Sequence, residues 1–144
     1  MSSPTPEYYR GDQADGITPP NLADTSTYAQ HIVHARGKRT RYTSISTDPA
    51  SITDFGTQLW RVLRPKLDEE NHSIEHHDAL LRVLLDQAHT AADKAARQIA
   101  REAHRRAQRR REALICWNFD VSGVARKDLQ AWAQRHVRPY FARV

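Results

Sequence analysis

The chain has 144 residues, a formal net charge of +5, and one cysteine. Hydrophobic residues make up 39% and charged residues 27%, a globular composition that excludes collagen-like and wholly disordered chains. The length predicts one domain. A single cysteine excludes an internal disulfide framework and a cysteine-based zinc site. We expect Cys116 to be a buried thiol, because it lies in an apolar run.

The sequence contains no membrane or export signal of the usual kinds. No stretch approaches the ~18 apolar residues that a membrane span requires, and the first residues lack the charged-then-apolar order of a signal peptide. We therefore expect a cytoplasmic protein, or one exported by a dedicated secretion system without a cleavable signal peptide.

The first half of the chain contains predicted helices and one predicted strand. Residues 26–35 favour a short helix that ends near Gly37. The β-branched and aromatic residues of 41–47 predict a strand, which Asp48-Pro49 closes. Ser51 and Asp54 form a capping-box pattern, so we expect a helix that continues until Pro65.

The second half is dominated by a long helical pattern. From about Ser73 to Arg111, leucine and alanine recur at steps of three and four residues. One rod of this length would measure roughly 58 Å, so we expect a break at Thr90-Ala91-Ala92-Asp93 and two antiparallel helices. Residues 113–121 predict the strongest strand. A terminal amphipathic helix is expected over residues 127–136.

Charge alternates between adjacent blocks of this helical region. Residues 67–93 carry one basic and seven acidic side chains, net −6, whereas residues 94–112 carry eight basic and two acidic, net +6. The alternation argues against a uniform nucleic-acid-coating surface but leaves a basic block for an anionic partner. The alternative is a solvated face whose charges pair with the acidic block along the helix edges.

Three short motifs stand in a suggestive order. The first is Tyr9-Arg10-Gly11-Asp12, the second is the hydroxyl-rich strand Tyr42 to Thr47, and the third is Glu112, directly before the strand at 113–121. In this order they resemble the ADP-ribosyltransferase fold of the cholera and pertussis toxin type. That family has an aromatic-Arg-x-Asp motif, a Ser-Thr-Ser strand and a later glutamate.

The match assigns individual positions. Arg10 and Asp12 match the first motif, Ser44 and Ser46 the second, and Glu112 the third. The family's third motif usually reads Glu/Gln-x-Glu, whereas this chain has Arg110-Arg111-Glu112. Because the missing acid helps to select a guanidinium acceptor, the resemblance does not imply an arginine acceptor.

The resemblance implies a fold and a function. The fold would be α+β, with a small split β-sheet in a single NAD-binding domain over residues 1–144 and a long helical insertion at about 67–112. The function would be that of a mono-ADP-ribosyltransferase or an NAD glycohydrolase, acting as a toxin or effector. NAD would be its substrate, the acceptor an unknown protein or nucleic acid, and an inhibitor or immunity protein a possible partner.

The chemistry of NAD cleavage assigns roles to the matched residues. A fixed carboxylate stabilises an oxocarbenium-like centre, and Glu112 would do this while holding a ribose hydroxyl. Arg10 would bind the pyrophosphate, and Ser44 would contact the ribose or orient Glu112. An aromatic ring is needed beside the nicotinamide, supplied by Tyr42 or Trp60. Asp12 and Ser46 complete the expected cofactor-binding set.

Other interpretations stay open at this point. The chain could be a non-enzymatic nucleic-acid-binding or protein-interaction module that uses the basic helix 94–112, or a relative that has lost the reaction. Arg10 and Asp12 could form a surface ion pair. His72 and His76 are i,i+4 neighbours, but the sequence fixes no third ligand and we expect no metal site.

Overall fold

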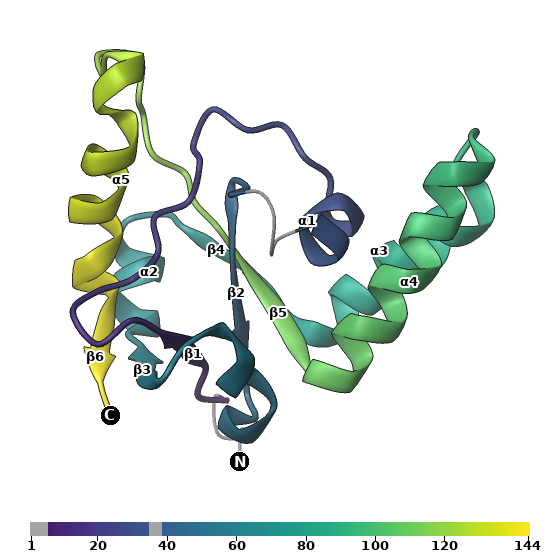
Figure 1. Cartoon of the computed structure of the whole chain (residues 1–144), viewed down its shortest axis with the longest axis horizontal. Helices are drawn as coiled ribbons and strands as arrows, with labels where there is room; N and C mark the ends of the chain where they lie inside the picture. Colours follow the sequence, from purple (N-terminus) through teal and green to yellow (C-terminus); the bar gives the residue numbers. More distant parts are fainter. Residues whose placement is uncertain (1–5, 35–38) are drawn as a thin grey trace.

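A computed structural model describes residues 6–34 and 39–144, with the backbone alone at residues 53–55. Within these residues the strands form one antiparallel sheet in the order β4-β5-β2-β1-β3-β6 (Figure 1). The strands are β1 (Tyr9–Asp12), β2 (Tyr42–Ser46), β3 (Gln58–Val62), β4 (Ser73–Glu75), β5 (Glu112–Cys116) and β6 (Phe141–Arg143). The architecture is α+β, as the sequence predicts.

Helices lie on both sides of this sheet. They are α1 (Tyr28–His34), α2 (Arg64–Glu69), α3 (His77–Thr90), α4 (Lys94–Arg110) and α5 (Leu129–Val137), with 3-10 turns at Pro49–Phe55 (η1), Arg126–Asp128 (η2) and Arg138–Tyr140 (η3). Figure 1 shows α3 and α4 as a hairpin that projects from one side of the molecule, whereas α5 stands at the opposite side. No described helix is both long and apolar enough to cross a membrane.

Two apolar clusters form the core, and β5 contributes to both. Ala113 and Ile115 belong to a cluster that includes Leu67 of α2 and Val137 of α5. Leu114 belongs to a second cluster with side chains of α1, α3 and α4. Because successive strand side chains point to opposite faces, the second cluster lies on the same face of β5 as the Glu112 side chain.

The helical region breaks where the sequence predicts. The α3 helix ends at Thr90 and α4 begins at Lys94, and the two helices pack against each other. Asp93 caps α4 by accepting a hydrogen bond from the Ala95 amide at 2.8 Å, whereas the Thr90 hydroxyl donates to the Asp86 carbonyl within α3. The ion pairs of α4 among the described residues are formed with Glu102 and Glu112, so the expected pairing of opposite charges between α3 and α4 is not seen in this part of the chain.

The helix predicted from Ser51 to Pro65 is wrong. After η1 the chain forms β3, in which Trp60 and Val62 are buried and Arg61 is exposed. This alternation has the period of two residues that a half-buried strand requires. Pro65 begins a helix instead of ending one: it lies in the first turn of α2, where the missing amide hydrogen has no intrahelical partner to lose.

Two further predictions need correction, and one strand was not predicted. Ser73–Glu75 forms β4, which pairs with β5, so the 67–112 region is not wholly helical. The β5 strand ends at Cys116, not at residue 121, and Cys116 is half-buried instead of buried. The sequence also gave no indication of β6, which pairs with β3 at the edge of the sheet.

The remaining predicted elements are present. Helix α1 lies within residues 26–35, β2 within residues 41–47, and α5 overlaps the predicted terminal helix of residues 127–136. The expected helix end at Gly37 lies outside the described residues.

Candidate active site

The three strands that carry the sequence motifs are neighbours in the sheet. Arg10 lies on β1, Ser44 on β2 and Glu112 at the start of β5, and the sheet order places β2 between the other two. The Arg10 Nη1 donates to the Ser44 carbonyl oxygen at 3.0 Å. The Ser44 hydroxyl donates to Glu112 Oε2 at 2.8 Å. The structure therefore joins the three residues into one hydrogen-bonded series, although 68 positions separate Ser44 from Glu112.

The carboxylate of Glu112 is almost completely enclosed. The residue is 1% exposed, and burial raises the pKa of its carboxyl group against the opposing effects of the Ser44 hydrogen bond and the Arg110 and Arg10 charges. Its Oε1 atom is buried and has no hydrogen-bond partner among the described residues, and Arg110 Nη1 lies 4.0 Å away. A buried acceptor without a donor is costly, so this oxygen is suited to a ligand hydroxyl.

Local structure places Glu112 at this position. Arg111 ends α4 in the left-handed conformation, with φ 49°, and the chain turns directly into β5. The carbonyl oxygen of Arg110 accepts hydrogen bonds from the Ser46 and Ser51 hydroxyls, each at 2.7 Å. Ser46 thus anchors the end of α4 to β2. Glu112 is the first residue of β5.

His31 of α1 is a further residue in this series. Its Nε2 lies 2.7 Å from the Ser44 hydroxyl oxygen, and its Nδ1 contacts the Thr40 hydroxyl. Because the one hydroxyl hydrogen of Ser44 goes to Glu112, we assign the ring hydrogen of His31 to Nε2, which donates a hydrogen bond to the Ser44 hydroxyl oxygen. Burial, followed by the charge of Arg10, lowers the pKa of His31 to about 3, so the ring is neutral at neutral pH.

Asp12 fixes Arg10 from the other side. Its carboxylate is fully buried and lies 3.0 Å from Arg10 Nε. It also accepts from the Gln13 amide and from both the amide and the hydroxyl of Thr18. The side chain of Arg10 is 12% exposed, so the two residues do not form a surface ion pair. Four donors from the chain already surround Asp12, so it positions the guanidinium.

The two aromatic candidates lie in different environments. Tyr42 is half-buried, and its ring contacts Tyr28 edge-on at 4.9 Å and the His31 ring at 5.7 Å. Trp60 is fully buried in the other apolar cluster, and its Nε1 donates to the Gln13 carbonyl. Trp60 is therefore closed to a ligand ring, and Tyr42 is the aromatic residue beside the hydrogen-bonded series.

The histidines considered for a metal have other partners. His72 Nε2 lies 3.1 Å from the Tyr140 hydroxyl, and the His72 ring packs against Phe119 at 4.4 Å. His76 Nδ1 lies 2.5 Å from the Tyr8 hydroxyl. Within residues 6–34 and 39–144 no group of three potential metal ligands occurs.

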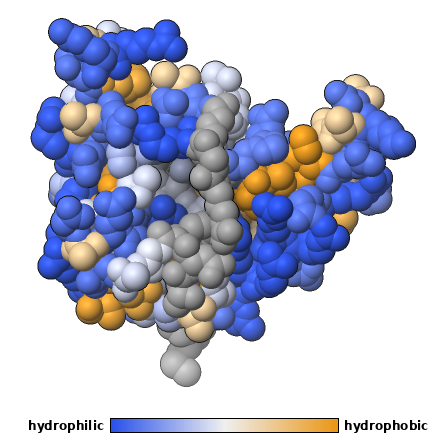
Figure 2. Space-filling view, viewed as in Figure 1, coloured by the Kyte–Doolittle hydropathy of each residue, from blue (hydrophilic) through white to orange (hydrophobic). Residues whose placement is uncertain are grey.

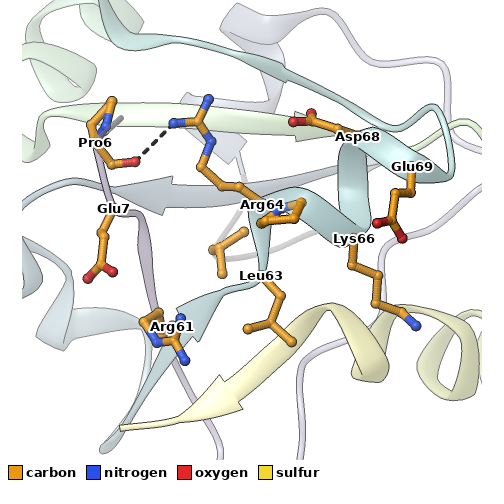
Figure 3. Close-up of a pocket in the computed structure, with 10 residues that line it drawn as sticks. Pro6, Glu7, Arg61, Leu63, Arg64, Lys66, Asp68 and Glu69 are labelled. Atoms are coloured by element: carbon orange, nitrogen blue, oxygen red, sulfur yellow. Dashed lines mark hydrogen bonds between the residues drawn. The ribbon is translucent and has the colours of Figure 1, made fainter. Parts of the chain in front are cut away.

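A large hollow of about 780 Å³ lies elsewhere, between the N-terminal segment, the end of β3 and the start of α2 (Figure 3). Acidic and basic side chains share its rim, and Arg64 Nη1 donates to the Pro6 carbonyl at 3.0 Å. Arg10, Ser44 and Glu112 do not line this hollow, so it is separate from the candidate active site.

Sequence reasoning identified Arg10, Asp12, Ser44 and Glu112 but not the partnership of His31 with Ser44. A histidine on the buried face of a short helix carries no sequence signal that specifies its partner on a strand. No protein-family description matches the chain, and neither a curated protein nor a solved structure shows significant similarity to it.

Proposed function

We propose that this chain consumes NAD as a mono-ADP-ribosyltransferase, with hydrolysis of NAD as the reaction when no acceptor is bound. One observation supports this proposal above the others. A buried carboxylate, that of Glu112, has one oxygen that accepts a hydrogen bond from Ser44, while the other, 4.0 Å from Arg110 Nη1, has no hydrogen-bond partner among the described residues. The order of the motifs along the chain is the independent support from the sequence.

The site residues fit the chemical demands of NAD cleavage. The unpartnered Oε1 of Glu112 can accept a hydrogen bond from a ribose hydroxyl, which removes the cost of a buried acceptor. The bond from Ser44 to Oε2 fixes the orientation of the carboxylate. A fixed carboxylate stabilises the positive charge that develops on the ribose carbon as nicotinamide departs.

The electrostatic environment of Glu112 sets the pH range in which its carboxylate can stabilise positive charge. Glu112 must be ionised to stabilise positive charge, but burial raises its pKa above the usual value for a glutamate. Below that pKa the carboxyl group is protonated and the stabilisation is lost. We therefore expect NAD turnover to fall at a higher pH than an exposed glutamate would give.

Arg10 and Tyr42 complete the proposed NAD site. The guanidinium of Arg10 has the planar donor fork that suits a pyrophosphate, and its bond to the Ser44 carbonyl ties that role to the strand. The half-buried Tyr42 would pack against the nicotinamide ring. Because Glu112 is 1% exposed, NAD binding requires the side chains over the carboxylate to move.

The test is nicotinamide release from NAD by the wild-type chain and by Glu112→Gln, measured by chromatography at neutral pH. The substitution keeps the shape and removes the charge, so we expect a loss of about 100-fold or more with an unchanged circular dichroism spectrum. Glu69→Gln, at an exposed position on α2, is the matched control and should keep full activity. Equal turnover by Glu112→Gln and the wild-type chain would contradict the proposal.

A further inference from the structure

The outer face of α4 carries a row of exposed polar side chains. The row, called here the basic stripe, consists of Lys94, Gln98, Arg101, Arg105, Gln108 and Arg109. From Lys94 to Gln108 the positions recur at steps of four and three, and Arg109 lies four residues after Arg105, so they share one face of the helix. The opposite face carries the buried residues Ala100, Ala103 and Ala107.

The position of the stripe leaves it open to a partner. Figure 1 shows the α3–α4 hairpin projecting from the molecule, and Figure 2 shows hydrophilic residues over its lower part, where α4 approaches β5. From Lys94 to Arg109 the stripe extends about 22 Å along the helix axis. It ends next to the candidate site in the chain, because β5 begins at Glu112.

The positive charge of the stripe is largely unneutralised. The one acidic residue within α4, Glu102, pairs with Arg105 and Arg106. Lys94, Arg101 and Arg109 have no ion pair among the described residues. Like charges at i,i+4, such as Arg101 with Arg105, destabilise an isolated helix. A row of cations that costs stability, and in which Arg105 is the one member with an ion pair among the described residues, fits an external anion.

The chemistry of the stripe distinguishes between classes of anionic partner. Protein interfaces centre on buried aromatic or aliphatic side chains, and a helix on a membrane surface needs an apolar face beside its cations. The stripe contains no large apolar residue; Leu85, which is 48% exposed, belongs to α3. A linear row of guanidinium groups matches the repeated phosphates of a nucleic acid strand.

We propose that the basic stripe binds the phosphate backbone of a nucleic acid, and that this nucleic acid is the acceptor of ADP-ribose. The acceptor part rests on the function proposed above. In the transfer, an oxygen or nitrogen of the nucleic acid bonds to the ribose C1′ atom of NAD. The bond from C1′ to the nicotinamide nitrogen breaks and its electron pair neutralises the departing ring, while the acceptor atom releases its proton to solvent.

The first measurement is binding of the full chain to fluorescein-labelled 20-nucleotide single strands of DNA and RNA, followed by anisotropy at several salt concentrations. The variant Arg101→Gln/Arg105→Gln/Arg109→Gln should bind about tenfold more weakly or worse at low salt. Loss of three phosphate contacts should also reduce the slope of log affinity against log salt by about 2. Unchanged affinity and slope would overturn the proposal.

A matched control separates the stripe from net charge. Arg126→Gln/Lys127→Gln/Arg135→Gln removes the same three charges from exposed positions on η2 and α5 and should bind like the wild-type chain. An equal loss of affinity in both variants would mean that binding depends on net charge alone, and it would overturn the proposal that the basic stripe is the binding surface. Binding to phosphatidylserine vesicles but not to nucleic acid would overturn the choice of partner.

The second measurement is transfer of label from NAD labelled in its adenosine part to the nucleic acid. We expect transfer by the wild-type chain and the control, and loss of transfer with intact nicotinamide release in the stripe variant. Stripe-dependent binding with nicotinamide release but no labelled nucleic acid would overturn the acceptor assignment alone. Stripe-dependent binding with no NAD turnover in any variant would overturn the proposed function and leave the docking surface standing.

Discussion

Ser44 has a single hydroxyl hydrogen, and its use determines the state of the residues on either side. Since that hydrogen goes to Glu112, the His31 ring must donate to Ser44 and accept from Thr40. A protonated His31 would place a second donor against the Thr40 hydroxyl and a charge in a buried site. His31 is thus a positioning residue that fixes the hydroxyl through which Glu112 is oriented.

The buried His31 should make the fold sensitive to acid. Its pKa is about 3 when folded, against 6.5 in the unfolded chain, so the unfolded state binds more protons between these values. Its contribution to stability is complete above pH 6.5 and is lost as pH falls toward 3. We expect the free energy of unfolding to fall by about 2 kcal/mol between pH 6.5 and pH 5 because of this group, since a shifted pKa contributes about 1.4 kcal/mol per pH unit.

The measurement is urea unfolding of the wild-type chain and His31→Gln at both pH values. Glutamine retains a donor and an acceptor but does not titrate, so the variant should lose less stability on acidification. His34→Gln, on the exposed side of the same helix, should lose as much stability on acidification as the wild-type chain. The same pH dependence in the wild-type chain and His31→Gln would refute the assignment.

The sequence was sufficient to identify the residues of the candidate site that belong to short ordered motifs. Arg10, Ser44 and Glu112 could be proposed because their three short motifs stand in a particular order along the chain, although none of the motifs is specific alone. The His31–Ser44 pair could not, because a hydrogen bond from a helix to a strand depends on how α1 packs over β2. The burial of Trp60 could not be predicted either, because the sequence alone does not distinguish an aromatic residue in the core from one in a ligand site.

At the scale of elements, the residue that joins α4 to β5 has an unfavourable backbone conformation. Arg111 adopts φ 49°, a conformation that a residue with a Cβ atom occupies at a cost of about 1–2 kcal/mol. Glycine is the residue that usually ends a helix in this way. An arginine here ends the helix less favourably than glycine would.

Arg111→Gly should therefore stabilise the protein. The gain from the left-handed position exceeds the extra unfolded-state entropy of glycine, and we expect a net increase of about 0.5–1 kcal/mol, or about 2–4 °C in Tm. Thermal unfolding followed by circular dichroism measures it. Gln108→Gly, inside the last turns of α4, should instead destabilise by about 1 kcal/mol. A lower Tm for Arg111→Gly would show that its side chain contributes more than its conformation costs.

Elements with a strong periodic pattern were predictable, and short strands were not. The α3–α4 hairpin followed from the leucine and alanine spacing and from the charge change at its tip. The β3 strand was misread because Leu59, Val62 and Leu63 also fit a helical spacing, while the alternation of Trp60 and Val62 spans few residues. The β4 and β6 strands have three residues each and depend on the partner strand for their definition.

At the scale of the whole molecule, the sheet separates two cores with different relations to the site. Leu114 and Ile115 are neighbours on β5 and both fully buried, but they face different clusters. Leu114 pairs directly with Ser44 in the register of β2 and β5. The two residues therefore allow a comparison of global stability with the geometry of the site.

Leu114→Ala and Ile115→Ala should each destabilise by about 2–5 kcal/mol, measured by urea unfolding. Under conditions in which both variants remain folded, only Leu114→Ala should lower nicotinamide release, because its cavity lies beside Ser44. Ile115→Ala serves as the control for stability. Equal activity losses in the two folded variants would show that the site depends on the sheet as a whole.

The connection between β4 and β5 has a consequence for how this protein can diverge. The two strands are antiparallel neighbours, so the α3–α4 hairpin occupies the place of an ordinary turn and leaves and re-enters the sheet at adjacent points. Insertions, deletions or exchange at its tip require no strand to be rethreaded. A change in the length or sequence of the hairpin can therefore alter the surface it presents while the sheet that supports Arg10, Ser44 and Glu112 keeps its strand order.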